Sequence, residues 1–346
     1  MRTHPQLTFT VGMPNMAPNQ LSEVELLKIF GDFQWDQIAS VLQCAPHELV
    51  SEAGDRLYPS FVAVEACFGP GSDISRFREG DRIHARGAIQ FYAKQFVEGL
   101  VVFDGHDLPP EAAIEAQSAP DRSRLESPWV SMTNAIVARV SDSNRLKTFR
   151  PAGIQSVSLP ESKEKPESLI AHERVMNDGS IDFGAGHQSL VPLEGRDDSP
   201  IPYTITPEND LNGAGLVYFA RYIAMMNYAE RTLLLRRLER PFSGQLAQCL
   251  STERRRTFFY SNASPTDEVL IYCSGSIIDP GRPPERAGAT LTRAMRFQFR
   301  FDLHRRLDGV LMASSLVNKS LTIPNGQRSL LAEARRFAGS MAQASA

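Results

Sequence analysis

The sequence predicts an α+β protein made of two tandem domains, in each of which a long helix packs against an antiparallel sheet. The chain has 346 residues, more than one domain usually holds. A short strand, a long amphipathic helix and a series of strands follow one another twice along it. The two predicted helices begin at Leu21 and Leu216, 195 positions apart, which favours an internal repeat.

The first domain is predicted to cover residues 1–150. Its helix is expected over residues 21–42, where apolar and charged side chains recur at helical spacing and Ser22 or Asn19 could act as the N-cap. Strands are expected over residues 57–68, 81–92, 96–103 and 129–140. The stretch 104–128, rich in Pro, Glu and Asp, is predicted to be a surface loop.

A connector is expected over residues 151–199, which are polar and rich in turn-forming residues. The second domain, residues 200–346, begins with a predicted strand over 202–206 and a predicted helix over 216–238. Strict alternation predicts a strand over 296–303. A hairpin turn at Asp308-Gly309 should lead into a last strand over 309–321.

The composition excludes several classes of function. A formal net charge of -3, with 22% charged residues, does not indicate a nucleic-acid or anionic-membrane binder. No apolar stretch is long enough to span a membrane, and the N-terminus does not resemble a signal peptide. Four singly placed cysteines and seven scattered histidines predict neither a disulfide scaffold nor a metal site. The expectation is a cytoplasmic protein.

The segment Asn209-Asp-Leu-Asn-Gly-Ala-Gly-Leu-Val-Tyr-Phe-Ala-Arg-Tyr resembles the start of the central helix in acyl-CoA thioesterases of the hot-dog fold. Gly215 and Tyr222 match that pattern, so the resemblance implies two tandem hot-dog domains, a double hot-dog. A glycine there would let a thioester approach the free amides of a helix N-terminus, which can hold a developing oxyanion. The alternative is an ordinary amphipathic helix start.

The same frame argues against hydrolysis. Asn212 stands where thioesterases carry a carboxylate, and Ala17 stands 195 positions before it. Neither side chain can activate water, and Asp210 is two positions out of register. A paired histidine and carboxylate, as dehydratases use, is also missing at these positions. Gly215 and Asn212 are therefore expected to bind a thioester without hydrolysing it.

A second resemblance extends through the first domain. The runs Gly12-Met-Pro-Asn-Met, Gly31-Asp-Phe-Gln-Trp, Gly54-Asp-Arg-Leu-Tyr-Pro-Ser-Phe and Trp129-Val-Ser-Met-Thr-Asn are similar to those of the LnmK-like family of polyketide biosynthesis. Members are double hot-dog acyltransferase/decarboxylases. The resemblance implies a methylmalonyl-like CoA thioester as substrate, an acyl carrier protein as partner, and no cofactor.

The family's catalytic tyrosine corresponds to Tyr58. A phenol can attack a thioester or donate a hydrogen bond to it, but its usual pKa near 10 requires help from a positive field. Arg56, Arg78 or a helix N-terminus could supply that field. The alternative interpretation of Tyr58 is a strand aromatic with its hydroxyl at the surface.

Other positions of the same motifs are candidates for substrate binding. Thr133 and Asn134 could orient a thioester, or could only pair strands. Gln34 is a further candidate; several relatives carry histidine at that position and asparagine at Val24, which puts decarboxylation in doubt because glutamine cannot transfer a proton. The basic run 254–256 could contact CoA phosphates or a carrier protein, or could be a solvated face.

Two other functions stay open. One is a hot-dog thioesterase or hydratase that acts on acyl-CoA or acyl carrier protein. The other is a module that binds acyl carrier protein without catalysis. A homodimer also stays open. The internal repeat already supplies the pairing that single hot-dog proteins reach by dimerising, so the fold does not require one.

Overall fold

The computed structural model of the protein describes residues 5–69, 74–119, 121–139, 146–183, 188–193, 195, 197–238, 242–279, 285–286 and 291–344. Val140, the predicted end of a strand, and Arg196 of the predicted connector lie outside these ranges. No helix in the described part is both long and apolar enough to cross a membrane.

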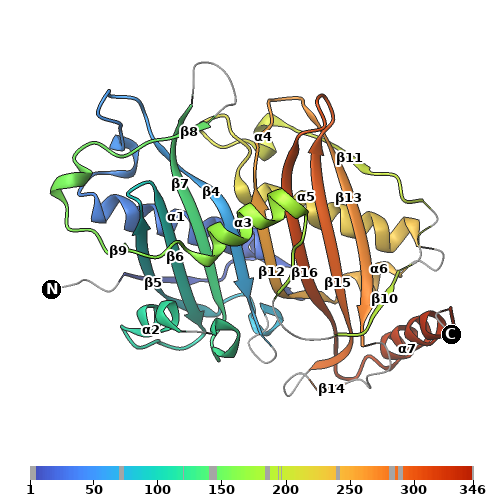
Figure 1. Ribbon diagram of the computed structural model, residues 1–346. Helices are drawn as coiled ribbons and strands as arrows, with labels where there is room; N and C mark the ends of the chain where they lie inside the picture. The colour runs from blue at the N-terminus through green and yellow to red at the C-terminus, as the bar shows by residue number, and fades with distance from the viewer. Residues whose placement is uncertain are drawn as a thin grey trace.

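The first half forms one side of a 14-stranded sheet, in the order β1-β5-β6-β7-β4, with helix α1 against one face (Figure 1). The elements are β1 (Gln6–Thr10), α1 (Glu23–Val41), β4 (Tyr58–Cys67), β5 (Arg82–Tyr92), β6 (Phe96–Asp104) and β7 (Trp129–Arg139). Neighbouring strands are antiparallel. The helix and strands predicted for this half are confirmed to within a few residues.

The second half repeats this arrangement in the order β12-β16-β15-β13, with β11 paired to the outer edge of β13 as β1 is paired to β5. The elements are β11 (Ile201–Thr204), α5 (Phe219–Thr232), β12 (Leu250–Phe259), β13 (Glu268–Ile278), β15 (Leu291–Arg305) and β16 (Leu311–Pro324). The strands predicted around the Asp308-Gly309 turn are β15 and β16, and Gly309 has φ 69° in that turn.

The two halves join through their central strands. β4 and β12 pair antiparallel from Cys67–Arg254 to Ala63–Phe258, so one sheet runs through both halves. Helices α1 and α5 lie side by side behind this sheet, and α3 (Glu167–Asp178) crosses the junction in front (Figure 1). The buried apolar cluster between sheet and helices includes side chains from both halves, among them Phe30 and Phe299, so the halves share one core.

Several short elements complete the chain. The strands are β2 (Met16–Ala17), β3 (Gln20–Leu21), β8 (Leu146–Thr148), β9 (Glu161–Ser162), β10 (Leu190–Pro192) and β14 (Glu285–Arg286). The 3₁₀ turns are η1 (Met13–Asn15), η2 (Pro46–Glu48), η3 (Ile74–Arg76), η4 (Arg122–Arg124) and η5 (Ile154–Ser156). The short helices are α4 (Pro207–Asp210) and α6 (Gly244–Ala247).

Helix α1 follows the sequence prediction closely. Ser22 is the N-cap, and its hydroxyl accepts a hydrogen bond from the amide of Glu25 at 3.3 Å. Leu26, Leu27 and Phe30 recur at helical spacing and are fully buried. Burying each such side chain contributes about 1.5–3 kcal/mol. The helix is therefore fixed by one apolar stripe and one cap.

Helix α5 begins later than predicted. Residues 212–218 form a turn, because Asn212 accepts two backbone hydrogen bonds through its side chain and Gly215 has φ 69°. An isolated bridge pairs Leu211 with Val217. The helix starts only at Phe219, and its last part, η6 (Leu233–Arg237), is wound as a π-helix. The predicted helix over 216–238 was too long at its start.

Two stretches expected to be irregular contain helices. The predicted loop 104–128 contains α2 (Ala112–Ser118), whose buried Ala113 and Ala116 pack near Trp129. The predicted connector contains α3, whose Leu169, Ala171 and Val175 are buried. Both helices are short and alternate small apolar with charged residues, so their helical spacing is weak in the sequence.

A C-terminal helix, α7 (Arg328–Ala344), was not foreseen as a separate element. It lies at the edge of the second half (Figure 1), where Phe337 packs against Phe242 with ring centroids 4.4 Å apart. The division into domains at 1–150 and 200–346, with 151–199 as connector, remains our proposal for this chain.

Candidate functional site

A cavity of about 1250 Å³ opens where the two central strands separate. The β4–β12 ladder ends at Ala63 and Phe258, and residues of both strands beyond this end line the cavity. Further lining comes from α1, β7, the segment before α5, the first turns of α5 and the β15–β16 hairpin. Because both halves supply its walls, neither half forms this cavity alone.

Tyr58, the predicted catalytic residue, lines the cavity as the first residue of β4. Its backbone is held by pairing with Val137 on β7. The guanidinium carbon of Arg56 lies 5.4 Å from the centre of the Tyr58 ring, and Arg56 also lines the cavity. The Tyr58 hydroxyl has no hydrogen-bond partner among the described residues. It is therefore free to meet a ligand.

The N-terminus of α5 also reaches the cavity. Tyr218 is the N-cap residue and Phe219 the first residue of the helix, and both line the cavity. No side chain caps this end; the amide of Arg221 donates to the carbonyl of Tyr218 at 2.8 Å, and the amides of Phe219 and Ala220 have no hydrogen-bond partner among the described residues. Together with the positive end of the helix dipole, they can stabilise an oxygen that gains negative charge.

Asp32 is a cavity residue that was not among the residues predicted from the sequence. It lies on α1. Its pKa is raised, mainly by burial and to a smaller extent by the neighbouring Asp36 carboxylate. The other two acidic residues of the lining are engaged, Asp308 with Arg305 and Asp267 with the amide of Ser264. Asp32 has no hydrogen bond or ion pair to any described residue. Its position in the run Gly31-Asp-Phe-Gln-Trp could have drawn attention to it, but charged residues on amphipathic helices usually face solvent.

Phenolic side chains surround the same space. Burial raises the pKa of Tyr218 and of Tyr222, so both stay protonated and can act as hydrogen-bond donors. The Tyr222 hydroxyl donates to the carbonyl of Ser261 at 2.9 Å, so it supports the wall. Tyr260 lines the cavity as well. The match of Tyr222 to the hot-dog helix pattern does not by itself indicate this place in the cavity wall.

Gln34 and Asn134 lie behind the cavity wall. The Gln34 amide nitrogen donates to the carbonyl of Met132 at 3.0 Å and to the side-chain oxygen of Asn134 at 2.7 Å. Asn134 in turn donates to the carbonyl of Pro59 at 3.4 Å, next to Tyr58. Both side chains are buried and neither is among the cavity-lining residues. The pair therefore ties α1 to the strands that carry Tyr58.

Asn212 and Gly215 shape the segment that leads into α5. Asn212 lines the cavity, but its side-chain oxygen accepts the amides of Ala214 and Leu216 at 3.0 and 3.1 Å. Gly215 lies four residues before the helix and is not among the lining residues. Asp210 is fully buried and pairs with Arg221 at 3.1 Å. Its carboxylate holds this turn to the helix and does not face the cavity.

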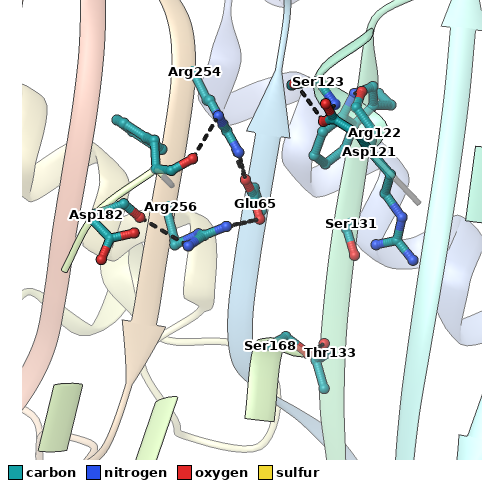
Figure 2. A network of polar contacts seen from close by, with 12 residues as sticks. Glu65, Asp121, Arg122, Ser123, Ser131, Thr133, Ser168, Asp182, Arg254 and Arg256 are labelled. Atoms are coloured by element: carbon teal, nitrogen blue, oxygen red, sulfur yellow. Dashed lines mark hydrogen bonds and ion pairs between the residues drawn. The ribbon is translucent and has the colours of Figure 1, made fainter. Parts of the chain in front are cut away.

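Thr133 lies on the opposite face of the sheet. It lies beside Ser168 of α3 (Figure 2), and the two hydroxyl oxygens are 2.7 Å apart. Side chains alternate along β7, so Asn134 faces α1 while Thr133 faces α3. The structure therefore does not bring Thr133 to the other predicted site residues.

The basic run 254–256 is used inside the protein. Arg254 and Arg256 both pair with Glu65, at 2.7 and 2.9 Å, and they hold the carbonyls of Phe183 and Asp182 (Figure 2). Arg255 points to the other face and is fully buried. Strand pairing places these side chains beside internal partners, and the suggested contact of this run with CoA or a carrier protein stays a prediction. Arg78, proposed as a positive field for Tyr58, bonds the carbonyl of Phe77 instead.

No family model and no curated protein sequence matches the chain. Among solved structures, an oleoyl thioesterase from Lactobacillus plantarum aligns with 91% of this chain and 95% of its own, at a TM-score of 0.53 and 7% identity. An acyl-ACP thioesterase from Bacteroides thetaiotaomicron aligns with a TM-score of 0.49 and 12% identity, over 91% of this chain and 96% of its own. The first of these similarities and the sheet topology show that the chain has the double hot-dog fold, in the α+β class predicted.

Proposed function

We propose that the protein is an enzyme that binds an acyl thioester in the cavity between its two halves. One observation carries this proposal. The Tyr58 hydroxyl, which has no hydrogen-bond partner among the described residues, lies in the same cavity as the N-terminus of α5, which no side chain caps. The helix amides can donate hydrogen bonds to the thioester oxygen, and the phenol oxygen can attack the thioester carbonyl carbon.

The specific reaction we propose is decarboxylation and acyl transfer from a malonyl-type CoA thioester to an acyl carrier protein, as the resemblance to the LnmK-like family implies. The Tyr58 oxygen would attack the thioester carbonyl, and CoA would leave as the thiol after taking the phenol proton. Loss of CO2 would leave an enolate, which is then protonated at carbon. A carrier-protein thiol would attack the tyrosyl ester and restore the phenol.

Arg56 supports a substrate that carries a carboxylate. Its guanidinium lines the cavity beside Tyr58 and makes no ion pair with any described residue. A free guanidinium can hold a carboxylate through two parallel hydrogen bonds.

The departures from the family at Val24 and Gln34 do not remove a group from the cavity. Val24 packs at the edge of the apolar core, and Gln34 bonds Met132 and Asn134 behind the wall. Neither side chain is among the lining residues. Decarboxylation is therefore part of the proposed reaction despite these two differences.

A second candidate function is thioester hydrolysis, and Asp32 is the observation that favours it. The sequence alone supplies no carboxylate at the expected position, but the fold brings this one into the cavity from α1. A carboxylate of raised pKa can take a proton from water as the water oxygen attacks the thioester carbonyl. The products would be the free acid and CoA.

One experiment separates these functions. The protein is incubated with malonyl-, methylmalonyl-, propionyl- and oleoyl-CoA, with and without an acyl carrier protein, and CO2, free acid and acyl-carrier product are measured. We expect CO2 and acyl-carrier product from a malonyl-type substrate. Free acid without CO2 would identify a thioesterase. Binding of carrier protein with no turnover of any thioester would identify a non-catalytic module and overturn the proposal.

A further inference from the structure

The two halves place equivalent residues at opposite ends of the central strand pair. Helices α1 and α5 begin at Glu23 and Phe219, and each central strand carries a bulge, near Val62 in β4 and Glu253 in β12. By this register the pair Phe61 and Phe219 at the cavity corresponds to the pair Thr252 and Glu23 at the other end. The contacts agree, because in each pair the helix residue touches the strand residue.

Equivalent residues of α1 and α5 are 196 positions apart in the structure, one more than the 195 positions predicted from the sequence repeat. A shift of 195 would match buried Phe33 with Tyr228, which is 46% exposed. A shift of 196 matches buried Gln34 with buried Glu230. These two side chains make equivalent contacts: Gln34 bonds Asn134 of β7, and Glu230 pairs with Lys319 of β16.

The end of the β4–β12 pair opposite the cavity is filled by side chains. Glu23 pairs with Arg255 at 2.6 Å and accepts a hydrogen bond from Thr252 at 2.8 Å. Glu230 pairs with Lys319 at 2.6 Å. Asn227 joins both pairs, with its oxygen 3.2 Å from Arg255 and 3.1 Å from Lys319. We call these residues the second-site cluster: Glu23, Asn227, Glu230, Thr252, Arg255 and Lys319.

The charged groups of the second-site cluster are paired with one another. Arg255 lowers the pKa of Glu23 although burial opposes its ionisation, so this carboxylate stays charged. Apart from half-buried Asn227, every member is at most 7% exposed. A ligand could enter only by separating these ion pairs and leaving buried charges unpaired, which is strongly unfavourable.

The two helix ends differ in the same sense. The start of α1 is capped by Ser22, and Glu23 of its first turn is bound to Arg255. The start of α5 has no side-chain cap and carries Phe219 at the position of Glu23. A buried carboxylate paired with Arg255 thus stands at the start of α1, whereas the ring of Phe219, which lines the cavity, stands at the equivalent position of α5.

We infer that the chain binds one acyl thioester, in the cavity beside Tyr58, and that the second-site cluster closes the equivalent place at the other end of the β4–β12 pair. This inference rests on the proposed function for the nature of the ligand. The closure itself rests on the contacts of the second-site cluster.

The first test counts binding sites on the full-length protein. The probe is a propionyl-CoA analogue in which a methylene group replaces the thioester sulphur, titrated by equilibrium dialysis. We expect one equivalent per chain. Two equivalents would overturn the inference and leave the proposed function standing. No binding would overturn the proposed function, and the inference of a single thioester site would be overturned with it.

A matched pair of variants tests closure without any need for binding. Ser60 lines the cavity and Thr252 belongs to the second-site cluster, and a cysteine at either position is a small change. The variants Ser60→Cys and Thr252→Cys are treated with N-ethylmaleimide under native conditions, and labelling is read at each peptide because four native cysteines are present. Thermal unfolding verifies that both fold.

We expect Ser60→Cys to be labelled rapidly and Thr252→Cys to be labelled at least 100-fold more slowly, at the rate of unfolding. Labelling of both variants at similar rates would overturn the inference. This outcome is independent of the proposed function, because the reagent requires only access and not recognition of an acyl group.

Discussion

The ring of Phe61 on β4 stacks on the ring of Phe219 at the start of α5, with centroids 3.7 Å apart and planes inclined by 24°. Phe61 belongs to the first half and Phe219 to the second, and both line the cavity. Gly31 of α1 makes room for this contact, because a Cβ there would lie 2.9 Å from the Phe219 ring. This contact holds the free amides of α5 next to the strand that begins at Tyr58.

Replacing Phe219 with alanine should destabilise the fold. Phe219 is only 4% exposed, and truncating a buried phenylalanine costs about 3–5 kcal/mol through lost burial and the cavity left behind. Urea denaturation gives the free energy of unfolding. Met176, which is 54% exposed on α3, supplies the control, since Met176→Ala should change stability by less than about 0.5 kcal/mol. Equal effects of the two substitutions would contradict this account of the core.

Tyr58→Phe should abolish acyl transfer. The substitution removes the hydroxyl that would accept the acyl group but keeps the ring beside Arg56. Loss of a nucleophile or proton donor of this kind lowers the rate on the order of 100-fold or more. The readout is CO2 release and acyl-carrier product from methylmalonyl-CoA. Tyr272→Phe is the matched control, because Tyr272 lies exposed on β13 outside the cavity and should keep full activity. Unchanged turnover in Tyr58→Phe would exclude Tyr58 as a catalytic residue.

Asp32→Asn tests the hydrolytic alternative through its pH dependence. If Asp32 is the base, release of free acid should increase with pH as this carboxyl loses its proton, at a pH above the usual value of about 4 because its pKa is raised. The asparagine variant should lose hydrolysis and keep thioester binding.

Asp36→Asn is the control for that experiment. Asp36 lies on the same helix, is not among the lining residues and helps to raise the pKa of Asp32. Its replacement should shift the activity profile to lower pH without abolishing activity. If Asp32→Asn hydrolyses thioesters as fast as the unchanged protein, Asp32 is not the base.

Periodicity predicted most of the fold, because the strands and α1 each carry a strong local pattern. Ser22 and the buried stripe of α1 are both visible in the sequence. The start of α5 was misplaced because Asn212 and Gly215 form a turn inside a helical pattern of apolar residues. Helix α3 was missed because its packing partner is the distant β4–β12 junction.

The candidate site was predictable only in part. Tyr58 came from a family resemblance, and the structure places it in the cavity. Asp32 and Tyr218 come together there from α1 and α5, and no local pattern reports a contact between residues about two hundred positions apart. Thr133 and Asn134 are neighbours in sequence but face opposite sides of the sheet, which motif matching alone cannot separate.

Protonation of His172 should weaken the fold at mildly acidic pH. Burial lowers the pKa of His172, and its ring nitrogen lies 3.0 Å from the carbonyl of Phe259, to which the neutral ring can donate. A histidine whose pKa is lower in the folded state favours the unfolded state once protonated. Its contribution is therefore fully present above the unfolded pKa of about 6.5 and is lost as pH falls below that value.

The measurement is the midpoint of thermal unfolding between pH 7.5 and 5, compared with a His172→Gln variant. That variant should lose less stability on acidification than the unchanged protein. His47→Gln removes an exposed histidine and should leave the pH dependence as it was. The same slope in all three proteins would contradict the assignment.

Removing one partner of an ion pair in the second-site cluster should lower the free energy of unfolding more than replacing both partners with apolar residues. Lys319→Met removes the partner of the fully buried Glu230 at 2.6 Å and leaves it only Arg231, 4.0 Å away; breaking a buried ion pair in this way costs about 3–5 kcal/mol. The double variant Lys319→Met with Glu230→Leu removes both charges and fills the space with apolar atoms, so most of the lost stability should return. Denaturation of the two single variants and the double variant gives the coupling energy directly. Additive losses would show that Lys319 and Glu230 act independently, and the pair would then no longer explain how this end of the molecule is closed.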